Sequence, residues 1–220
     1  MRYRKKLEKY TESCELENIQ MRLEIGSLEQ HRRYLMTTHD NIWYVATEYF
    51  RLFQYGYMKP TVSNASRTTP FSLSQQDFVS KVIASDVAFN ARCGRERMMK
   101  QWKLLSQWFA GIEFNLMELK SISAGSLVAA TITSITFTER TMHIVFPHLM
   151  SGKRRMLGEK LLNRRIVMHG SVRLVWSTTN CQIIGLFAES DMLTPVLRLL
   201  GNLQDTSYVF EKAAISPSFW

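Results

Sequence analysis

Hydrophobic residues recur with a seven-residue period near the start of the chain. The repeating positions are Leu7, Cys14, Met21, Leu28 and Leu35, and the positions offset between them are Thr11, Asn18, Ile25 and Arg32. The segment contains no proline, and its only glycine is Gly26, so a helix can continue through most of it. An apolar seam of this period predicts a long helix that pairs with a second helix in a coiled coil.

Asn18 places a polar side chain inside this seam. A single buried Asn at such a position lowers stability but selects the register and the two-stranded form. Across the pair, Glu17 would face Arg22 with opposite charge, whereas Glu24 would face Glu29 with like charge. Because a partner with a cation opposite Glu24 would bind better than a second copy, the pattern favours a heterodimer.

The same predicted helix carries a second apolar stripe, formed by Leu16, Ile19 and Leu23. This stripe allows an alternative, in which the helix packs on the chain's own globular part or on a further partner. We interpret Cys14 as a small apolar residue of the seam rather than as a redox sensor across the dimer.

The rest of the chain changes from a helical period to a period of two. Helices are predicted from Ile42 to Tyr57, from Gln75 to Ser85 and from Arg92 to Phe109, with a short strand from Asp86 to Asn90. After Gly111 the apolar residues alternate with polar ones, as in half-buried antiparallel strands. The predicted strands are Phe114 to Ile122, Leu127 to Thr138, Met142 to Phe146, Arg165 to Thr178 and Cys181 to Met192.

This order of elements predicts an α+β fold, with a long N-terminal zipper helix followed by helices and then a curved antiparallel sheet. We expect three parts: residues 1–38 as the zipper helix, 39–202 as the α+β domain, and 203–220 as a C-terminal tail. Pro195 to Leu200 should add a short helical turn, and the tail should be irregular.

Composition limits the functional classes. Hydrophobic residues make up 45% of the 220 residues, which predicts a packed core. The net charge is +9, but residues 1–40 hold eight Lys or Arg and seven Asp or Glu, so most of the excess lies in the later domain. An anionic partner is expected.

Three scattered cysteines predict a reducing compartment. No membrane partner, metal site or cofactor is predicted, because membrane-length apolar runs and ligand motifs are lacking.

The run R-Y-R-K-K at residues 2–6 precedes the seam without a break, and Arg4 lies ten residues before Cys14. This spacing between the cationic run and the seam resembles that of basic leucine zipper (bZIP) proteins, in particular their oomycete branch. The resemblance implies a nuclear protein that binds DNA and pairs with another bZIP chain. It assigns DNA binding to Arg2, Tyr3, Arg4, Lys5 and Lys6, and dimerisation to Leu7, Cys14, Asn18, Met21, Ile25, Leu28 and Leu35.

The chain departs from the bZIP pattern at one position. The family places an Asn, or in the oomycete branch often a Cys, eight residues before the Arg that Arg4 matches. That position would fall ahead of Met1, so the base-reading half of the basic region is expected to be absent from this chain. Either the true start lies upstream, or the chain is a truncated relative that dimerises but reads DNA poorly.

The element order over residues 41–200 resembles the nuclear transport factor 2-like cone fold, in which a bent sheet wraps a helix around a cavity. That fold hosts both enzymes and binding modules, which leaves a small ligand open. The polar candidates for such a cavity are Asp86, His143, His169 and Glu189, although nothing in the sequence pairs them, and no catalytic residue is assigned.

The sequence therefore predicts a bZIP transcription factor and not an enzyme. The alternatives are a cone-fold ligand binder or enzyme with a helical oligomerisation arm, and a truncated zipper that sequesters bZIP partners. The basic block from Gly152 to Arg165 is either a nuclear import signal, an extra phosphate contact or a solvated loop face.

Overall fold

The structure is a computed structural model, and it describes residues 10–11, 14–27, 42–58, 75–150 and 154–220. The chain divides into two compact units, Met1–Asp40 and Asn41–Trp220. In the first unit, residues 14–27 form a helix, as the seven-residue period predicts. The remainder of the predicted zipper helix, with Leu7, Leu28 and Leu35, lies outside the described residues.

The second unit begins with three helices close to those that the sequence predicts. Residues 83–85, predicted as the end of the second helix, instead belong to the strand Ile83–Phe89. Helix α2 spans Ile42–Phe53, α3 spans Gln75–Val82 and α4 spans Arg95–Trp108. The buried residues of α2 are Val45, Ala46, Tyr49, Phe50 and Phe53, which return every three to four positions to one face. Residues Arg92–Cys93, predicted to start the α4 helix, instead form the short strand β2.

Gln75 ties α2 to α3. Its side-chain amide nitrogen donates to the carbonyl oxygens of Leu52 and Gly56, at 2.7 and 2.8 Å, and its oxygen accepts from the backbone N–H of Met58 at 3.0 Å. These bonds satisfy carbonyls that the C-terminal end of α2 leaves without helical partners. A buried glutamine thereby fixes the chain on both sides of residues 59–74.

A six-stranded sheet forms the centre of this unit, in the order β2-β1-β6-β5-β4-β3. Its strands are β1 Ile83–Phe89, β2 Arg92–Cys93, β3 Ala110–Ser123, β4 Ser126–Thr136, β5 Arg165–Ser177 and β6 Gln182–Ser190. The predicted α+β class is confirmed. The sheet is mixed rather than purely antiparallel, because β1 pairs with β6 in parallel.

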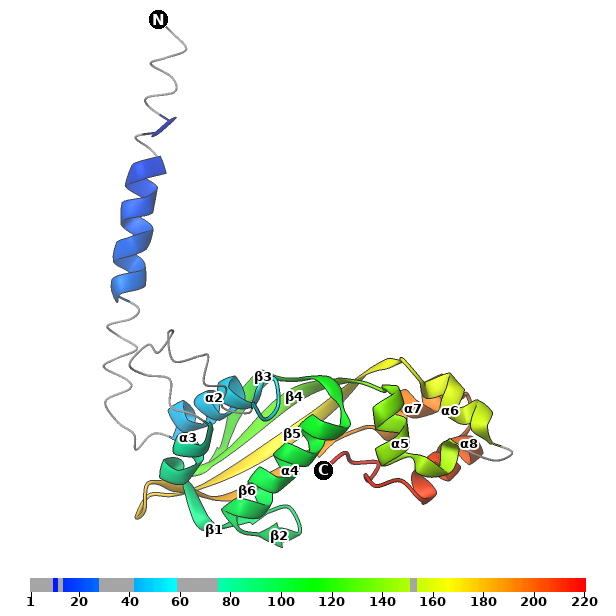
Figure 1. The fold of residues 1–220 in the computed structure, drawn as a ribbon. Helices are drawn as coiled ribbons and strands as arrows, with labels where there is room; N and C mark the ends of the chain where they lie inside the picture. The colour runs from blue at the N-terminus through cyan, green and yellow to red at the C-terminus, as the bar shows by residue number, and fades with distance from the viewer. Residues whose placement is uncertain (1–9, 12–13, 28–41, 59–74, 151–153) are drawn as a thin grey trace, which may run out of the picture. The chain divides into compact units, whose positions relative to one another are not determined.

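The helices cover the sheet in two groups (Figure 1). One core cluster lies between the sheet and α2, α3 and α4. A second cluster lies at the other end of the unit, under the C-terminal part of α4 and the later helices. Those helices are α5 Glu139–Val145, the 3₁₀ turn η2 Pro147–Leu149, α6 Arg155–Leu161, α7 Leu193–Leu200 and α8 Leu203–Glu211.

The predicted strand from Met142 to Phe146 is wrong, because this segment lies in and just after α5. Thr138 caps α5: its side-chain oxygen accepts from the backbone N–H of Thr141 at 3.2 Å, and Thr141 Oγ1 accepts from the backbone N–H of Thr138 at 3.2 Å. This reciprocal arrangement is a capping box. The run T-E-R-T is therefore a helix start and not a hairpin turn.

Residues 203–220 are not an irregular tail. They contain α8, and the segment after it runs beside the end of β6, where Ser190 N–H donates to Ser218 O and Met192 N–H donates to Pro217 O, both at 3.0 Å. This path brings Trp220 against Trp102, with ring centroids 5.1 Å apart. The end of the sequence thus supplies part of the core.

Tyr49 and Trp102 form a polar contact inside the first core cluster. Trp102 Nε1–H donates to the Tyr49 hydroxyl at 3.0 Å, and both side chains are almost fully buried. Burial raises the pKa of Tyr49 above its usual value, and the bond from Trp102 offsets part of this rise. The phenol therefore stays neutral and available as an acceptor at physiological pH.

We predict that Tyr49→Phe lowers the free energy of unfolding by about 1–3 kcal/mol, because it leaves a buried indole N–H without an acceptor. Urea denaturation measures the change. Tyr55 is 58% exposed, so Tyr55→Phe is the matched control and should change stability by less than about 0.5 kcal/mol. Equal unfolding midpoints for the two variants would contradict the assigned bond.

Candidate functional site

The four polar residues proposed for a cavity do not come together. Asp86, His143, His169 and Glu189 are all exposed, and they lie on β1, α5, β5 and β6 respectively. Among the described residues, no hydrogen bond or ion pair joins any two of them. The structure therefore forms no acid–base pair from these groups.

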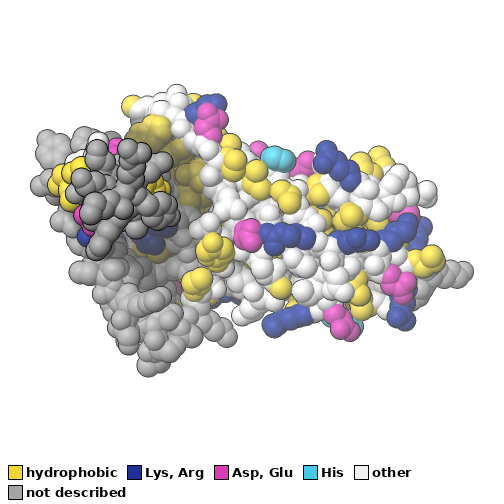
Figure 2. Space-filling view, turned by 90° about the horizontal axis from the view of Figure 1, so that it is seen from above, with side chains coloured by type: hydrophobic (Ala, Val, Ile, Leu, Met, Phe, Trp, Pro, Cys, Tyr) yellow, Lys and Arg dark blue, Asp and Glu magenta, His cyan; other side chains and the backbone are white. Residues whose placement is uncertain are grey.

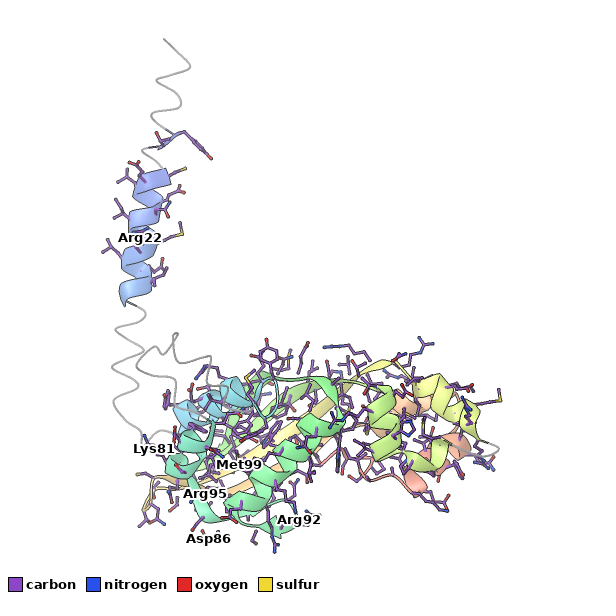
Figure 3. All side chains as sticks on the ribbon, in the orientation of Figure 1. Arg22, Lys81, Asp86, Arg92, Arg95 and Met99 are labelled. Carbon is purple, nitrogen blue, oxygen red and sulfur yellow. The ribbon has the colours of Figure 1, made fainter. Side chains whose placement is uncertain are left out.

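Aromatic side chains fill the space between the sheet and α2 and α4. Trp102 lies at the centre, with ring centroids 5.0 Å from Phe53, 5.4 Å from Phe114 and 5.1 Å from Trp220. The dense packing of side chains between α4 and the sheet is visible in Figure 3. The interior of this unit is a packed core, so surfaces are the better candidates for function.

An open groove of about 980 Å³ lies beside α8. Arg154 lies over the Tyr208 ring there, with its guanidinium carbon 4.1 Å from the ring centroid. His148 is held nearby, with Nε2 3.2 Å from Tyr208 O. No three His, Cys, Asp or Glu side chains of the described residues approach one another as a metal site requires.

The helix of residues 14–27 carries four of the predicted dimerisation residues. Met21 is 53% exposed and Ile25 is 56% exposed, while Cys14 is half-buried. Asn18 donates from its amide nitrogen to Cys14 O at 3.1 Å. The competing stripe is equally uncovered, since Leu16 and Leu23 are about 70% exposed. The exposures therefore do not distinguish the predicted seam from the competing stripe.

The predicted DNA-binding residues Arg2, Tyr3, Arg4, Lys5 and Lys6 lie outside the described residues. So do the seam residues Leu7, Leu28 and Leu35. Their roles remain predictions from the sequence pattern.

Helix α4 concentrates positive charge, and two of its cations have structural partners. Arg95 donates to the carbonyl oxygens of Ser80 and Ile83, at 2.7 and 3.1 Å, and so closes the end of α3. Lys103 lies over the Tyr57 ring at 5.0 Å. Figure 3 shows Lys81 and Arg95 near the same end of the unit. Arg95 and Lys103 thus have a structural role, because their cationic groups contact other parts of the same unit.

The remaining cations of this region are Arg92, Arg97 and Lys100, which are exposed. Among the described residues, none of the three belongs to an ion pair. Together with Gln101 and Leu104 they line a groove of about 360 Å³. Arg92 projects beside the N-terminal end of α4 (Figure 3). We call these three residues the α4 cation face.

Two cations of the basic block from Gly152 to Arg165 have acidic partners. Arg155 pairs with Glu159 at 3.2 Å, and Arg165 pairs with Glu113 at 2.7 Å. Its central part is helix α6 rather than a loop. On the face seen in Figure 2, acidic side chains likewise stand among the Lys and Arg side chains. Lys160 and Arg164 of this block are exposed and, among the described residues, form no ion pair. The α4 cation face differs in that its three cations without ion pairs line one groove.

A family model supplies the functional comparison. Residues 43–108 match the model of the BZIP transcription factor 1 C-terminal domain. The matched region runs from α2 to the end of α4 and therefore contains the α4 cation face. This match supports a role in the regulation of transcription.

No curated protein matches the chain. Solved structures that match include an NTF2-like protein of unknown function from Exiguobacterium sp. 255-15, at 12% identity over 67% of this chain and 98% of that one, with a TM-score of 0.42. TsrD from Streptomyces laurentii matches at 15% identity over 72% and 96%, with a TM-score of 0.44. A SnoaL-like polyketide cyclase from Agrobacterium tumefaciens matches at 18% identity over 57% and 84%, with a TM-score of 0.41.

None of the described helices is both long and apolar enough to cross a bilayer.

We predict that Asn18→Leu strengthens self-association and permits complexes larger than dimers, because it removes the polar residue that favours two strands. Sedimentation equilibrium of the full chain measures the change. Gln20 lies on the outer side of the predicted pair, so Gln20→Leu adds the same side chain outside the seam and should leave the mass distribution unchanged. Identical behaviour of the two variants would show that residues 14–27 do not pair through the predicted seam.

Proposed function

We propose that this protein is a DNA-binding transcription factor of the bZIP type that acts as a dimer in the nucleus. The observation that carries the proposal is the order of two features along one chain. A cationic run in zipper phase precedes a region that matches a bZIP factor's C-terminal domain. Each feature was identified from different residues, so their combination is stronger support than either alone.

In this proposal the cationic run enters the major groove at the fork of the dimer. Arg4 takes the place of the invariant bZIP arginine, and Arg2, Lys5 and Lys6 mainly neutralise phosphates. Tyr3 lies within the same contact segment. The seam holds two chains parallel, with Asn18 facing an amide of the partner. The like charges of Glu24 and Glu29 across a homodimer favour another bZIP chain as the partner.

We propose that the Asn41–Trp220 unit is an interaction module and not an enzyme. Two features support this view: the aromatic rings around Trp102 fill its interior, and the polar candidates Asp86, His143, His169 and Glu189 face outward. A general acid and base would need to lie within hydrogen-bond reach of each other and of a substrate.

A grafting experiment tests the proposed dimer. The base-reading half of a basic region with a known DNA site is joined ahead of Arg4 in the phase of the zipper. We predict that the grafted chain binds that site at least about a hundredfold more tightly than unrelated duplexes, as specific factors do. The chain without the graft should bind duplexes weakly and with a strong dependence on salt. Gel-shift titration measures both.

The matched control carries the same graft and one residue inserted between Lys6 and Leu7. The insertion turns the basic helix by about 100° relative to the seam, and we expect it to abolish specific binding. Equal binding with and without the insertion would refute the parallel fork. Removal of an intact bZIP factor from DNA by the ungrafted chain would instead support the sequestering role.

A further inference from the structure

The outer side of α4 carries more positive charge than folding requires. Five of the twelve residues from 92 to 103 are Lys or Arg, and one, Glu96, is acidic. Arg95 and Lys103 have the partners described above, which leaves the α4 cation face of Arg92, Arg97 and Lys100. Exposed like charges on one short segment repel one another unless an anion is present.

The shape of this surface suits an extended anion. The groove of the α4 cation face adjoins a second groove of about 390 Å³, and the two share Arg92, Gln101 and Leu104 as lining residues. The first groove contains one apolar side chain, Leu104. Protein partners usually anchor apolar or aromatic side chains in buried pockets. The first groove offers little for such an anchor, whereas the second is also lined by Phe89, Trp108, Ile215 and Trp220, so the anion site lies along the first groove.

We infer that the α4 cation face binds the phosphodiester backbone of duplex DNA, outside the bases read by the bZIP dimer. The inference rests on the proposed function, which brings the chain to DNA. Arg97 and Lys100 lie three residues apart on one helix face, so both can contact phosphates of one strand. Contacts of this kind add affinity and salt dependence without adding sequence preference.

The test uses the full chain with Arg97→Glu and Lys100→Glu combined, and a mixed-sequence 40-base-pair duplex as the probe. Fluorescence anisotropy over a range of salt concentrations gives the affinity and its salt slope. We expect affinity at low salt to fall about tenfold or more. The slope of log K against log salt should fall by about two, because two phosphate contacts are lost.

The matched control is Arg140→Glu with Lys212→Glu, which makes the same change in net charge at two exposed positions outside α4. It should change affinity less than threefold. Melting curves of both variants should superimpose on that of the wild type, because all four side chains are exposed. An equal loss of affinity in the two double variants would show that overall charge alone attracts DNA, and would overturn the inference.

A variant with Met21→Asp and Ile25→Asp separates this inference from the proposed function. If the zipper variant retains weak duplex binding that the α4 variant removes, the inference stands even if the bZIP proposal fails. If the zipper variant loses all binding while the α4 variant binds as the wild type does, the inference fails and the bZIP proposal stands. Tighter binding of the α4 cation face to poly-glutamate or to single-stranded DNA than to the duplex would overturn the duplex assignment.

Discussion

The packing of Trp102 is the contact on which the rest of the globular unit depends. Helix α4 supplies this indole, α2 supplies Tyr49 and Phe53, β3 supplies Phe114, and the C-terminal segment supplies Trp220. Four segments, of which only α4 and β3 are consecutive in the sequence, therefore meet at one side chain. Aromatic residues bury large areas and favour tilted and edge-on contacts, so this centre sets the distance between the helices and the sheet.

A filled centre has consequences for function. A ligand in the interior would have to displace rings such as Trp102 and Trp220 that are already packed at native contact distances. This packing supports the proposal that the unit acts through its surface. The region that matches the bZIP C-terminal domain model contains core residues, such as Tyr49 and Trp102, and exposed cations, such as Arg97 and Lys100.

Sequence periodicity predicted most elements but failed where local signals were ambiguous. The alternation in β4 and β5 was sufficient, because buried residues recur at nearly every second position over eleven residues or more, although the inward positions of β4 include Thr131 and Thr133. The segment from Met142 to Phe146 is too short for that test. Its buried residues include Met142, Val145 and Phe146, which is a helical spacing, but the sequence alone does not show that Ile144 is exposed. The parallel pairing of β1 with β6 and the position of Trp220 depend on contacts between distant segments.

The candidate site residues likewise divide into features that the sequence could show and features that required the structure. The sequence places Arg95, Arg97, Lys100 and Lys103 on one helix, and nothing in their identity separates structural cations from available ones. The structure does so, because Arg95 meets carbonyl oxygens of α3 and Lys103 meets an aromatic ring. The four polar cavity candidates could be rejected only once their exposure was known. Arg2 to Lys6 lie outside the described residues and remain assigned by the bZIP resemblance alone.

The distribution of charge along the chain bears on the two DNA contacts proposed above. Residues 2–9 hold five Lys or Arg and one Glu, but residues 10–40 hold three cations and six acids. The zipper segment is therefore repelled by phosphates, whereas the residues ahead of it are attracted. The remaining residues, 41–220, have a net charge of +8, so phosphates attract this part of the chain. In the proposed complex, phosphates would therefore attract residues 2–9 and the Asn41–Trp220 unit and repel the acidic segment between them.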